Sequence, residues 1–357
     1  MPDKQKIKVA VGVSGGVDSS VAVALLKEQG YDVIGVFMHF WHESVKGKVR
    51  DNICCSLESS EDARRVCQKL NIPFYTMNMK VQFKKNVVDD FIDEYSKGRT
   101  PNPCVRCNRY VKFGEFIKKA KALGVDYVAT GHYAKVKEKK DGLVHLYMGK
   151  DKAKDQSYFL HQLTQTQLKS ILFPLGDLNK DKVRRLAKKF GLATASKKES
   201  QEICFIPDGD VAGFLSRKTK FEPGKIQDFQ TKEVLGAHEG LPRYTIGQRK
   251  GIGLAGGPWF VVRLDMKKNI LWVSKDEKDL LSKKLIVKNV NWLAGEPKFP
   301  TKVKCRIRYR SKEADAIIDK YDGKIEVVFS RPERAVTSGQ YGVFWKGKEC
   351  LGGGVIE

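Results

Sequence analysis

A glycine-rich segment near the N-terminus constrains the fold of this chain more than any other feature. The run Val11-Gly-Val-Ser-Gly-Gly-Val-Asp-Ser-Ser20 follows a strand-like stretch at 8–13 and opens a helical pattern at 18–29. In such a turn the backbone N–H groups and the helix N-terminus hold anionic oxygens, and Gly15 and Gly16 allow a phosphate to approach closely. Asp18 suits a phosphate site when a divalent cation lies between them, which predicts bound Mg²⁺. A Walker loop is excluded because no Gly-Lys-Ser/Thr follows, and the alternative is a plain capped turn.

Short apolar runs alternate with helical patterns through the first 200 residues. Further strands are expected at 32–38, 73–77 and 126–131, and helices at 60–70, 81–96, 108–123 and 180–190. This alternation predicts an α/β fold with an N-terminal doubly wound parallel sheet. After about residue 206, short alternating strands between Gly and Pro turns predict two small all-β domains, the last of them barrel-like. The predicted domains are 1–206, 207–277 and 278–357.

The chain is strongly basic, with a net charge of +24 over 357 residues. The excess is shared between the predicted α/β part (+14 over 1–205) and the β part (+10 over 206–357). Such a charge favours a polyanionic partner, most often nucleic acid, over the alternative of a merely solvated basic surface. No stretch approaches the roughly 18 apolar residues of a membrane span, and no signal peptide is visible. We therefore expect a cytoplasmic protein that has no membrane partner.

Eight cysteines, at 54, 55, 67, 104, 107, 204, 305 and 350, do not form the pattern of a disulfide framework. The pair Cys104-Val-Arg-Cys107 precedes a helical pattern for which Asn108 is the expected N-cap. A thiol near a helix N-terminus, with Arg106 and Arg109 alongside, should be biased toward thiolate. A zinc knuckle is the alternative, but zinc needs four ligands and no second CxxC exists. Cys67 and Cys305 are expected to be packing residues.

The loop Ser14-Gly-Gly-Val-Asp-Ser19 resembles the PP-loop of the ATP pyrophosphatases, which split ATP into AMP and pyrophosphate while adenylating an oxygen of their substrate. Further segments narrow the resemblance to one family, the bacterial tRNA 2-thiouridylases, which convert the wobble uridine (position 34) of certain tRNAs to 2-thiouridine. The matching segments run nearly end to end: Cys54 to Ser56, Asp62 to Arg64, Asn102 to Asn108, Thr130 to Tyr133, Lys154 to Ser157, Ser200 to Pro207, Tyr244 to Gly251, and Arg308 with Tyr309.

The resemblance implies a sulfurtransferase that uses ATP and Mg²⁺. It implies that Cys204 carries sulfur as a persulfide, and that Cys107 either resolves the intermediate as a disulfide or releases sulfide as the nucleophile. A sulfur donor, either a desulfurase or a relay protein, is implied as a second partner beside tRNA, and DNA is not. The implied ATP site is Gly12, Val13, Ser14, Gly15, Gly16, Val17, Asp18 and Ser19, with Met38 and Gly131 flanking the adenosine. The implied target-base and tRNA contacts are Asn102, Pro103, Cys104, Lys154, Asp155, Gln156, Arg308 and Tyr309.

One position departs from the family pattern. Many members carry Asp where this chain has Cys104. Three thiolates, from Cys104, Cys107 and Cys204, suit a 4Fe–4S cluster with one unligated iron that carries sulfide. The persulfide and the cluster mechanisms therefore both stay open at this point, as does the role of Cys54 and Cys55.

Two other classes of function remain as alternatives. One is another PP-loop synthetase that amidates or ligates a small metabolite, although this class does not predict the β half or the distant cysteines. The other is an RNA-binding protein with a vestigial nucleotide fold. The segment Gly251-Ile-Gly253-Leu-Ala-Gly256 matches a dinucleotide fingerprint, but a strand-like stretch follows it where a helix is required, which argues against a Rossmann site.

Overall fold

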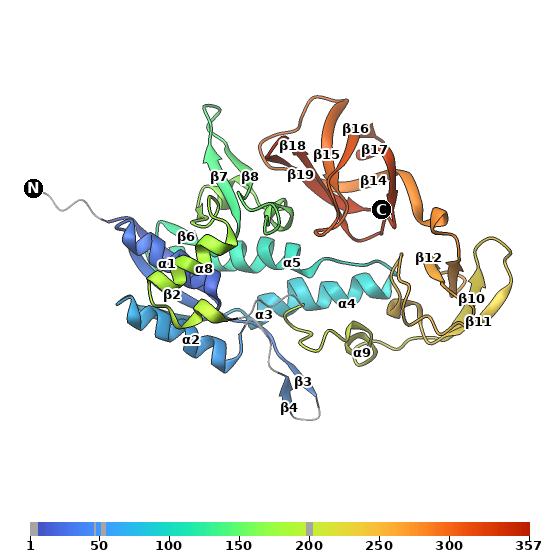
Figure 1. The fold of residues 1–357 in the computed structure, drawn as a ribbon, viewed down its shortest axis with the longest axis horizontal. Helices are drawn as coiled ribbons and strands as arrows, with labels where there is room; N and C mark the ends of the chain where they lie inside the picture. Colours follow the sequence, from blue (N-terminus) through green and yellow to red (C-terminus); the bar gives the residue numbers. More distant parts are fainter. Residues whose placement is uncertain (1–5, 46–47, 51–54, 198–202) are drawn as a thin grey trace, which may run out of the picture. The chain divides into compact units, whose positions relative to one another are not determined.

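The computed structural model describes residues 6–45, 48–50, 55–197 and 203–357 (Figure 1). Cys54, Ser200, Gln201 and Glu202 lie outside the described residues. The chain divides into two compact units, which we describe separately. The first unit comprises 1–87, 103–209 and 348–350, and the second comprises 88–102, 210–347 and 351–357. The three-domain division stays a prediction.

The first unit is built on a five-stranded sheet of order β5-β2-β1-β6-β9, in which all neighbours pair in parallel. The predicted parallel sheet is therefore confirmed. The central strand β1 is fully buried at Val9, Ala10 and Val11, as expected for a parallel strand covered on both faces. The strands are β1 (Lys8–Val13), β2 (Asp32–His39), β5 (Phe74–Asn78), β6 (Tyr127–Ala129) and β9 (Ile171–Leu172).

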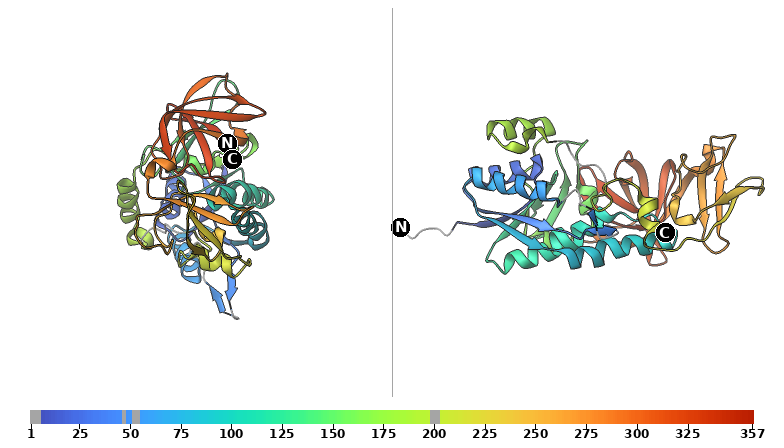
Figure 2. Two further views of the ribbon diagram at one scale, coloured as in Figure 1. Left: turned by 90° about the vertical axis from the view of Figure 1, so that its right-hand side faces the viewer. Right: turned by 90° about the horizontal axis from the view of Figure 1, so that it is seen from below.

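Helices cover both faces of this sheet (Figure 2). Helices α1 (Val17–Glu28), α2 (Leu57–Lys69) and α8 (Lys180–Lys189) lie on one face, and α8 packs on α1. On the other face, α6 (Phe116–Lys121) contacts β6. Because the loop between β1 and α1 follows the carboxyl end of the central strand, it lies where ligands bind in open α/β sheets.

The helical run that ends in α6 begins earlier than the sequence pattern predicts. It starts at Pro103 with α5 (Pro103–Arg106), continues as a π-helical segment η2 (Cys107–Glu115) and ends in α6. Proline is favoured at the first helical position because it has no N–H to satisfy. The predicted N-cap at Asn108 is therefore wrong: Asn108 lies inside the run, and its side-chain amide donates to the carbonyl of Phe159 (3.3 Å).

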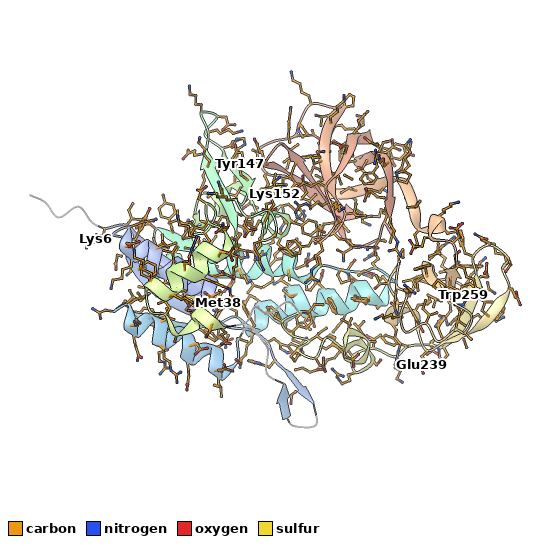
Figure 3. All side chains as sticks on the ribbon, viewed as in Figure 1. Lys6, Met38, Tyr147, Lys152, Glu239 and Trp259 are labelled. Carbon is orange, nitrogen blue, oxygen red and sulfur yellow. The ribbon has the colours of Figure 1, made fainter. Side chains whose placement is uncertain are left out.

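A hairpin of β7 (Ala134–Glu138) and β8 (Val144–Met148), which the sequence pattern did not predict, follows β6 in the first unit. Glu349 and Cys350 pair with β8. The side chains of the β7–β8 hairpin are drawn in Figure 3, where Tyr147 of β8 is labelled. The remaining elements of this unit are β3 (Glu43–Val45), β4 (Lys48–Arg50), α3 (Lys80–Phe83), η1 (Lys84–Val88), η3 (Ser157–Leu160), α7 (Gln165–Leu168) and η4 (Ala193–Ser196).

The second unit holds two β structures, as predicted. A four-stranded sheet of order β11-β10-β13-β12 is followed by a six-stranded barrel, β14-β17-β16-β15-β18-β19, that closes by pairing of β14 with β19. The strands are β10 (Gly224–Asp228), β11 (Val234–His238), β12 (Phe260–Asp265), β13 (Ile270–Ser274), β14 (Leu281–Trp292), β15 (Thr301–Arg306), β16 (Ala314–Tyr321), β17 (Lys324–Arg334), β18 (Tyr341–Lys346) and β19 (Glu349–Ile356). The helices are α4 (Asp89–Ser96) and α9 (Val211–Ser216), with short turns η5 (Leu241–Arg243) and η6 (Glu277–Leu280).

Each β structure has its own apolar core. In the first, Val261, Leu271 and Val273 are fully buried, and in the barrel Val287, Ile318 and Val327 are. The segment after Gly256 enters strand β12 and not a helix, as the sequence pattern predicted. Within the described part of the chain, no helix is long and apolar enough to cross a membrane.

Candidate nucleotide and thiol site

The glycine-rich loop joins β1 to α1, and serine hydroxyl groups hydrogen-bond to the backbone within it. Gly16 is the extended N-cap of α1 and has no side chain with which to cap the helix. The hydroxyls of Ser19 and Ser20 donate to the Gly16 carbonyl (3.1 and 2.8 Å), and the Ser14 N–H donates to Ser19 Oγ (3.2 Å). The N–H groups of the first turn have no helical acceptor. They and the positive end of the helix dipole therefore favour an anion at this position.

Gly15 is required by both its conformation and its neighbour. Its φ is +67°, in the left-handed region, and a Cβ at this position would lie 2.2 Å from the carbonyl oxygen of Ser59. Ser59 belongs to the first turn of α2, whose N-cap is Ser56. The tight turn of the loop is thus held directly against the start of a second helix.

The residues expected to flank a nucleotide converge on this loop from two other strands. A Cβ on Gly131, which follows β6, would lie 2.7 Å from the Ser19 backbone nitrogen and 2.8 Å from the Asp18 carbonyl carbon. A Cβ on Gly12 would lie 3.0 Å from the terminal methyl of Met38. Met38 lies near the end of β2 and is labelled in Figure 3. The structure therefore brings together Gly12, the loop, Met38 and Gly131, and their role as nucleotide contacts stays a prediction from the resemblance.

Two residues that no sequence spacing identified complete the loop. Lys180 Nζ lies 2.8 Å from both carboxylate oxygens of Asp18, and the Tyr133 hydroxyl donates to Asp18 Oδ1 (2.6 Å). The Lys180 and Asp18 side chains are 11% and 29% exposed. Asn179 caps α8, and Asp151 accepts the Lys180 backbone N–H (3.0 Å), so the start of α8 is fixed on two sides. The only sequence signal for Lys180 was a basic helical pattern preceded by a good N-cap residue. This pattern does not predict which side chain the first lysine of the helix contacts.

His132, next to Tyr133, is held neutral. Burial lowers the pKa of its imidazole well below the ordinary value, and the nearby charge of Lys112 adds to the effect. Its Nδ1 lies 2.6 Å from the Thr130 hydroxyl. Phe113 and Phe173 pack on its ring. A buried neutral imidazole with a fixed partner supports the Thr130–Tyr133 turn, which sets the position of Gly131.

The donors around the loop fit a magnesium ion that is shared with phosphate. Asp18 supplies one carboxylate, and Mg²⁺ is usually bound through one or two carboxylates together with substrate phosphates. In the structure this carboxylate is paired with Lys180 and Tyr133. A cation at Asp18 therefore requires the Lys180 ammonium to move away from the carboxylate.

The candidate thiols lie along and beyond the helical run that starts at Pro103. Cys104 is exposed, Cys107 is 7% exposed, and Cys204 is partly buried. The bias of these thiols toward thiolate stays a prediction. The Arg106 and Arg109 guanidiniums lie over the ring of Tyr110, 4.6 and 5.3 Å from its centroid.

Among the described residues, no group of three or more His, Cys, Asp or Glu side chains lies close enough to hold a metal ion. The arrangement of Cys104, Cys107 and Cys204 in this structure thus does not fit a 4Fe–4S cluster, and we derive no step through one. Burial raises the pKa of the Cys67 thiol to about 12 and raises that of Cys305 further. Both are inert packing residues, as predicted.

Three residues expected to touch tRNA, Lys154, Asp155 and Gln156, lie in a loop of the first unit, and two of them hold the loop itself. Asp155 is 1% exposed, and its carboxylate accepts hydrogen bonds from the Gly149 N–H (3.0 Å) and the Ser157 hydroxyl (2.9 Å). Gln156 Oε1 accepts the backbone N–H of Tyr133 (3.0 Å). A contact of these two with RNA stays untested, but their side chains already connect the loop to the Tyr133 turn.

In the second unit, the Arg308 guanidinium donates to the Ala335 carbonyl and to the Thr337 hydroxyl (2.6 Å). Arg308 and Tyr309 follow strand β15 and are partly buried. Asn102 ends the segment of the second unit that precedes Pro103, and Pro103 is buried.

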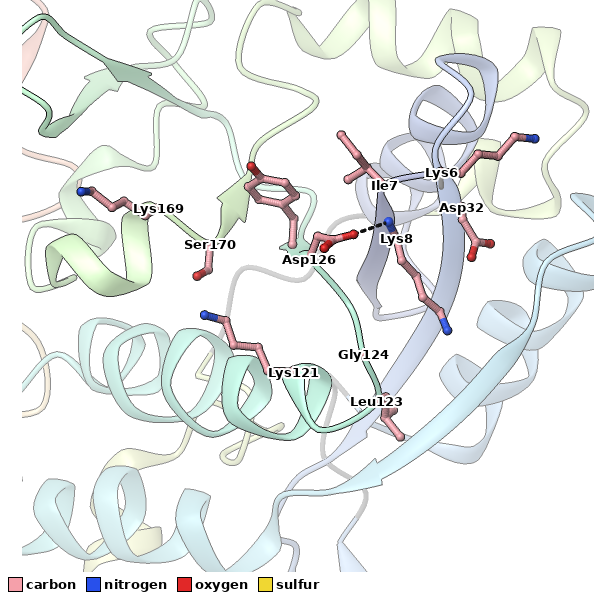
Figure 4. A pocket seen from close by; sticks show the side chains of 11 residues that line it. Lys6, Ile7, Lys8, Asp32, Lys121, Leu123, Gly124, Asp126, Lys169 and Ser170 are labelled. Carbon is pink, nitrogen blue, oxygen red and sulfur yellow. Dashed lines mark hydrogen bonds between the residues drawn. The ribbon is translucent and has the colours of Figure 1, made fainter. Parts of the chain in front are cut away.

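A pocket with a volume of about 1500 Å³ lies at the amino ends of the parallel strands, opposite the glycine-rich loop (Figure 4). Lys8 and Asp32, which begin β1 and β2, line it, and the Lys8 N–H donates to Asp126 Oδ2 (2.8 Å). Because the glycine-rich loop follows the carboxyl end of β1, this pocket does not belong to the nucleotide site.

Comparison with known proteins places the whole chain. It matches three families in succession: tRNA methyl transferase HUP domain over 7–208, tRNA methyl transferase PRC-barrel domain over 212–275, and aminomethyltransferase beta-barrel domain over 282–356. A protein of Clostridium perfringens (strain 13 / Type A) named tRNA-specific 2-thiouridylase MnmA is 49% identical, covering 99% of each chain. One of Clostridium botulinum (strain Alaska E43 / Type E3) with the same name is 47% identical, covering 99% of this chain and 98% of its own. A solved 4-thiouridine synthetase–RNA complex with bound ATP aligns at 18% identity over 59% of this chain and 50% of its own, with a TM-score of 0.34, too low to argue from.

Identity near one half thus extends over at least 98% of this chain and of both relatives. This chain belongs to the tRNA-specific 2-thiouridylase MnmA family.

Proposed function

We propose that the protein is an ATP-dependent tRNA 2-thiouridylase that replaces the C2 oxygen of the wobble uridine by sulfur and releases AMP and pyrophosphate. The observation that carries the proposal is the closed glycine-rich loop, with Gly131 packed on its first helical turn, in a chain whose full-length relatives bear that name. The net charge of +24 supports a tRNA substrate, because phosphate neutralisation dominates nucleic-acid affinity.

The loop would bind the phosphates of ATP. The N–H groups of Val17 and Asp18 point from the helix N-terminus, Ser14 and Ser19 add hydroxyls, and Met38 packs beside the adenosine. Lys180 would leave Asp18 to donate to a phosphate oxygen, and Asp18 would then hold Mg²⁺. The chemistry that Mg²⁺ would supply at Asp18 is neutralisation of phosphate charge.

Cys204 and Cys107 would divide the sulfur chemistry. The uridine C2 oxygen would first attack the α-phosphate of ATP, which releases pyrophosphate and leaves the oxygen adenylated. The terminal sulfur of a Cys204 persulfide then attacks the C2 carbon and displaces AMP. The Cys107 thiolate then attacks the Cys204 sulfur, which leaves 2-thiouridine on the tRNA and a Cys107–Cys204 disulfide. A sulfur donor protein and a reductant would restore Cys204 for the next turnover.

The target uridine must leave its stack to meet these thiols. Asn102, Pro103 and Cys104 are our candidates for facing the flipped base. Lys154 and Tyr309 are candidates for backbone contacts, as is Arg308 if its guanidinium leaves Thr337. Contacts to phosphate position the substrate, whereas contacts to the base select it.

The experiment is a thiolation assay on unmodified tRNA with ATP, Mg²⁺ and a persulfide donor, with nucleosides identified by mass spectrometry. We expect 2-thiouridine and tRNA-dependent release of pyrophosphate. Cys107→Ala and Cys204→Ala should abolish 2-thiouridine while ATP binding persists. Cys67→Ala is the matched control, because the Cys67 thiol is buried and its pKa is about 12.

Other products would point to other functions. A methylated nucleoside would support the activity in the name of the matched family, and pyrophosphate release with a small acid or amine in the absence of tRNA would support a metabolite synthetase. A Cys204→Ala variant that thiolates tRNA like the wild type would overturn the assignment. Anaerobic purification with iron analysis tests the cluster variant: a colourless, iron-free protein that thiolates tRNA would exclude it.

A further inference from the structure

The helical run from Pro103 to Lys121 is wound unusually in its middle. Nine residues, Cys107–Glu115, form a π-helix between α5 and α6. π-helical winding is rare, is mostly confined to single turns inside α-helices, and is frequent at functional sites. A stretch of this length needs interactions from outside the helix that favour the wider winding. The candidate catalytic residue Cys107 is the first residue of the stretch.

The side chain of Gln167, in the short helix α7, supplies one such interaction. Its Nε2 donates to the carbonyl oxygens of both Arg109 and Phe113, each at 2.8 Å. Its Oε1 accepts the backbone N–H of Thr164 (2.9 Å), which fixes the orientation of the amide. Both side-chain N–H groups are thus spent on two carbonyls of the π-helical segment, one turn apart.

Gly114 supplies a second, independent feature at the same place. A Cβ on Gly114 would lie 2.9 Å from the Arg109 carbonyl oxygen and 3.9 Å from Gln167 Nε2. A side chain there would displace the carbonyl that Gln167 binds. The missing Cβ and the bridging amide therefore act on one carbonyl group.

The winding decides which way Cys107 faces. The α6 end of the run is anchored, because Phe116 and Ala120 are fully buried. Returning the π-helical segment to α-helix would rotate its start around the helix axis, because an α-helix turns through a larger angle per residue than the wider π-helix. Such a rotation would carry Cys107, now 7% exposed, to a different face of the helix.

We propose that Gln167, together with Gly114, is a positioning residue that holds the π-helical winding of Cys107–Glu115 and thereby sets the direction of the Cys107 thiol. The relevance to thiolation rests on the proposed function, but the winding itself does not. Gln167 acts through the backbone and not on substrate.

The chain offers a matched control on the same helix. The Gln165 side chain also makes two hydrogen bonds to backbone. Its Nε2 donates to the Val144 carbonyl (2.8 Å), and its Oε1 accepts the Val144 N–H (3.0 Å). These bonds join α7 to the β7–β8 hairpin and not to the Cys107 segment. Gln→Met at either position keeps the side-chain length and removes the donors.

The test compares Gln167→Met and Gln165→Met in the full chain. We expect amide hydrogen exchange within 107–115 to accelerate about tenfold or more in Gln167→Met alone, because two hydrogen bonds to this segment are lost. In the same variant, the pH profile of Cys107 alkylation should shift its midpoint, or the alkylation rate at a given pH should change severalfold. Trypsin cleaves after Arg106, so Cys104 and Cys107 fall in different peptides and their alkylation is read separately by mass spectrometry.

Two results would overturn the proposal. One is a folded Gln167→Met variant whose exchange and Cys107 alkylation profile match the wild type, and the other is an equal change in Gln165→Met. If Gln167→Met does not fold, Gly114→Ala takes its place with the same measurements. A shifted Cys107 profile with no thiolation by the wild type would keep the positioning role and refute the proposed function.

Discussion

The Asp18–Lys180 pair gives the sharpest test of the nucleotide site. We predict that Lys180→Met lowers both the stability of the free protein and its affinity for ATP. In the free protein the ammonium lies 2.8 Å from both oxygens of a carboxylate that is 29% exposed. In the ATP complex we propose that it contacts phosphate.

The magnitude follows from the partly buried geometry. An exposed ion pair contributes about 0–1 kcal/mol, and breaking a fully buried one costs about 3–5 kcal/mol. Asp18 keeps its Tyr133 hydrogen bond when Lys180 is removed. We therefore expect a loss of about 1.5–3 kcal/mol, the range for hydrogen bonds to charged groups. This corresponds to a fall of about 3–12 °C in melting temperature. Losing a similar contact to phosphate raises the Kd for ATP by about 10- to 100-fold.

Thermal unfolding and titration calorimetry with ATP and Mg²⁺ measure the two quantities. Lys182→Met is the control, because it removes the same charge from an exposed position of the same helix. Adding Asp18→Asn to both backgrounds gives the coupling energy of the pair. If Lys180→Met loses stability but binds ATP within twofold of the wild type, Lys180 serves only to neutralise Asp18. If neither quantity changes, the pair itself is refuted.

Three further predictions concern other parts of the first unit. Gly131→Ala should weaken ATP binding at least tenfold, measured by calorimetry, because its Cβ would meet the Ser19 backbone nitrogen at 2.7 Å; unchanged affinity would contradict the packing. Gly15→Ala should lower the melting temperature, since its φ of +67° and the Ser59 carbonyl at 2.2 Å both oppose a Cβ, whereas Gly142→Ala, with an open surrounding, should have a smaller effect. Burial alone would raise the pKa of Glu349, but hydrogen bonds from Lys139 and His145 outweigh it and leave the pKa below 4.5. Glu349→Gln should therefore destabilise the protein at neutral pH, and the difference from wild type should vanish as pH falls below about 4.5, as followed by unfolding at several pH values.

The sequence predicted the parallel sheet and the loop well because both depend on local patterns. The strand–glycine–helix order sets the loop, and the spacing of apolar runs sets the strands. The positions of Met38 and Gly131 followed from the resemblance, and the sheet places them because both come at or after the carboxyl ends of strands next to β1.

What the sequence did not predict depends on long-range contacts. Lys180 meets Asp18 across 162 residues, and no spacing encodes such a meeting. The helix start at Pro103 was missed because Asn108 is an equally good cap by composition. The π-helical winding was missed because it depends on Gln167, a residue of another element, and on the carbonyl that faces Gly114.

The strand order of the first unit also has a consequence for the growing chain. Strand β1 is made first, but its neighbours β2 and β6 and the helix α8 that packs on α1 follow at residues 32, 127 and 180. At about 5–20 residues per second, the ribosome needs on the order of ten seconds or more between Asp18 and Lys180. Until residue 127 is made, the apolar strand Lys8–Val13 lacks its β6 partner, and until Lys180 is made the carboxylate of the loop lacks its cation. The nucleotide loop is thus among the first parts of the chain to be synthesised and among the last parts of its unit to be completed.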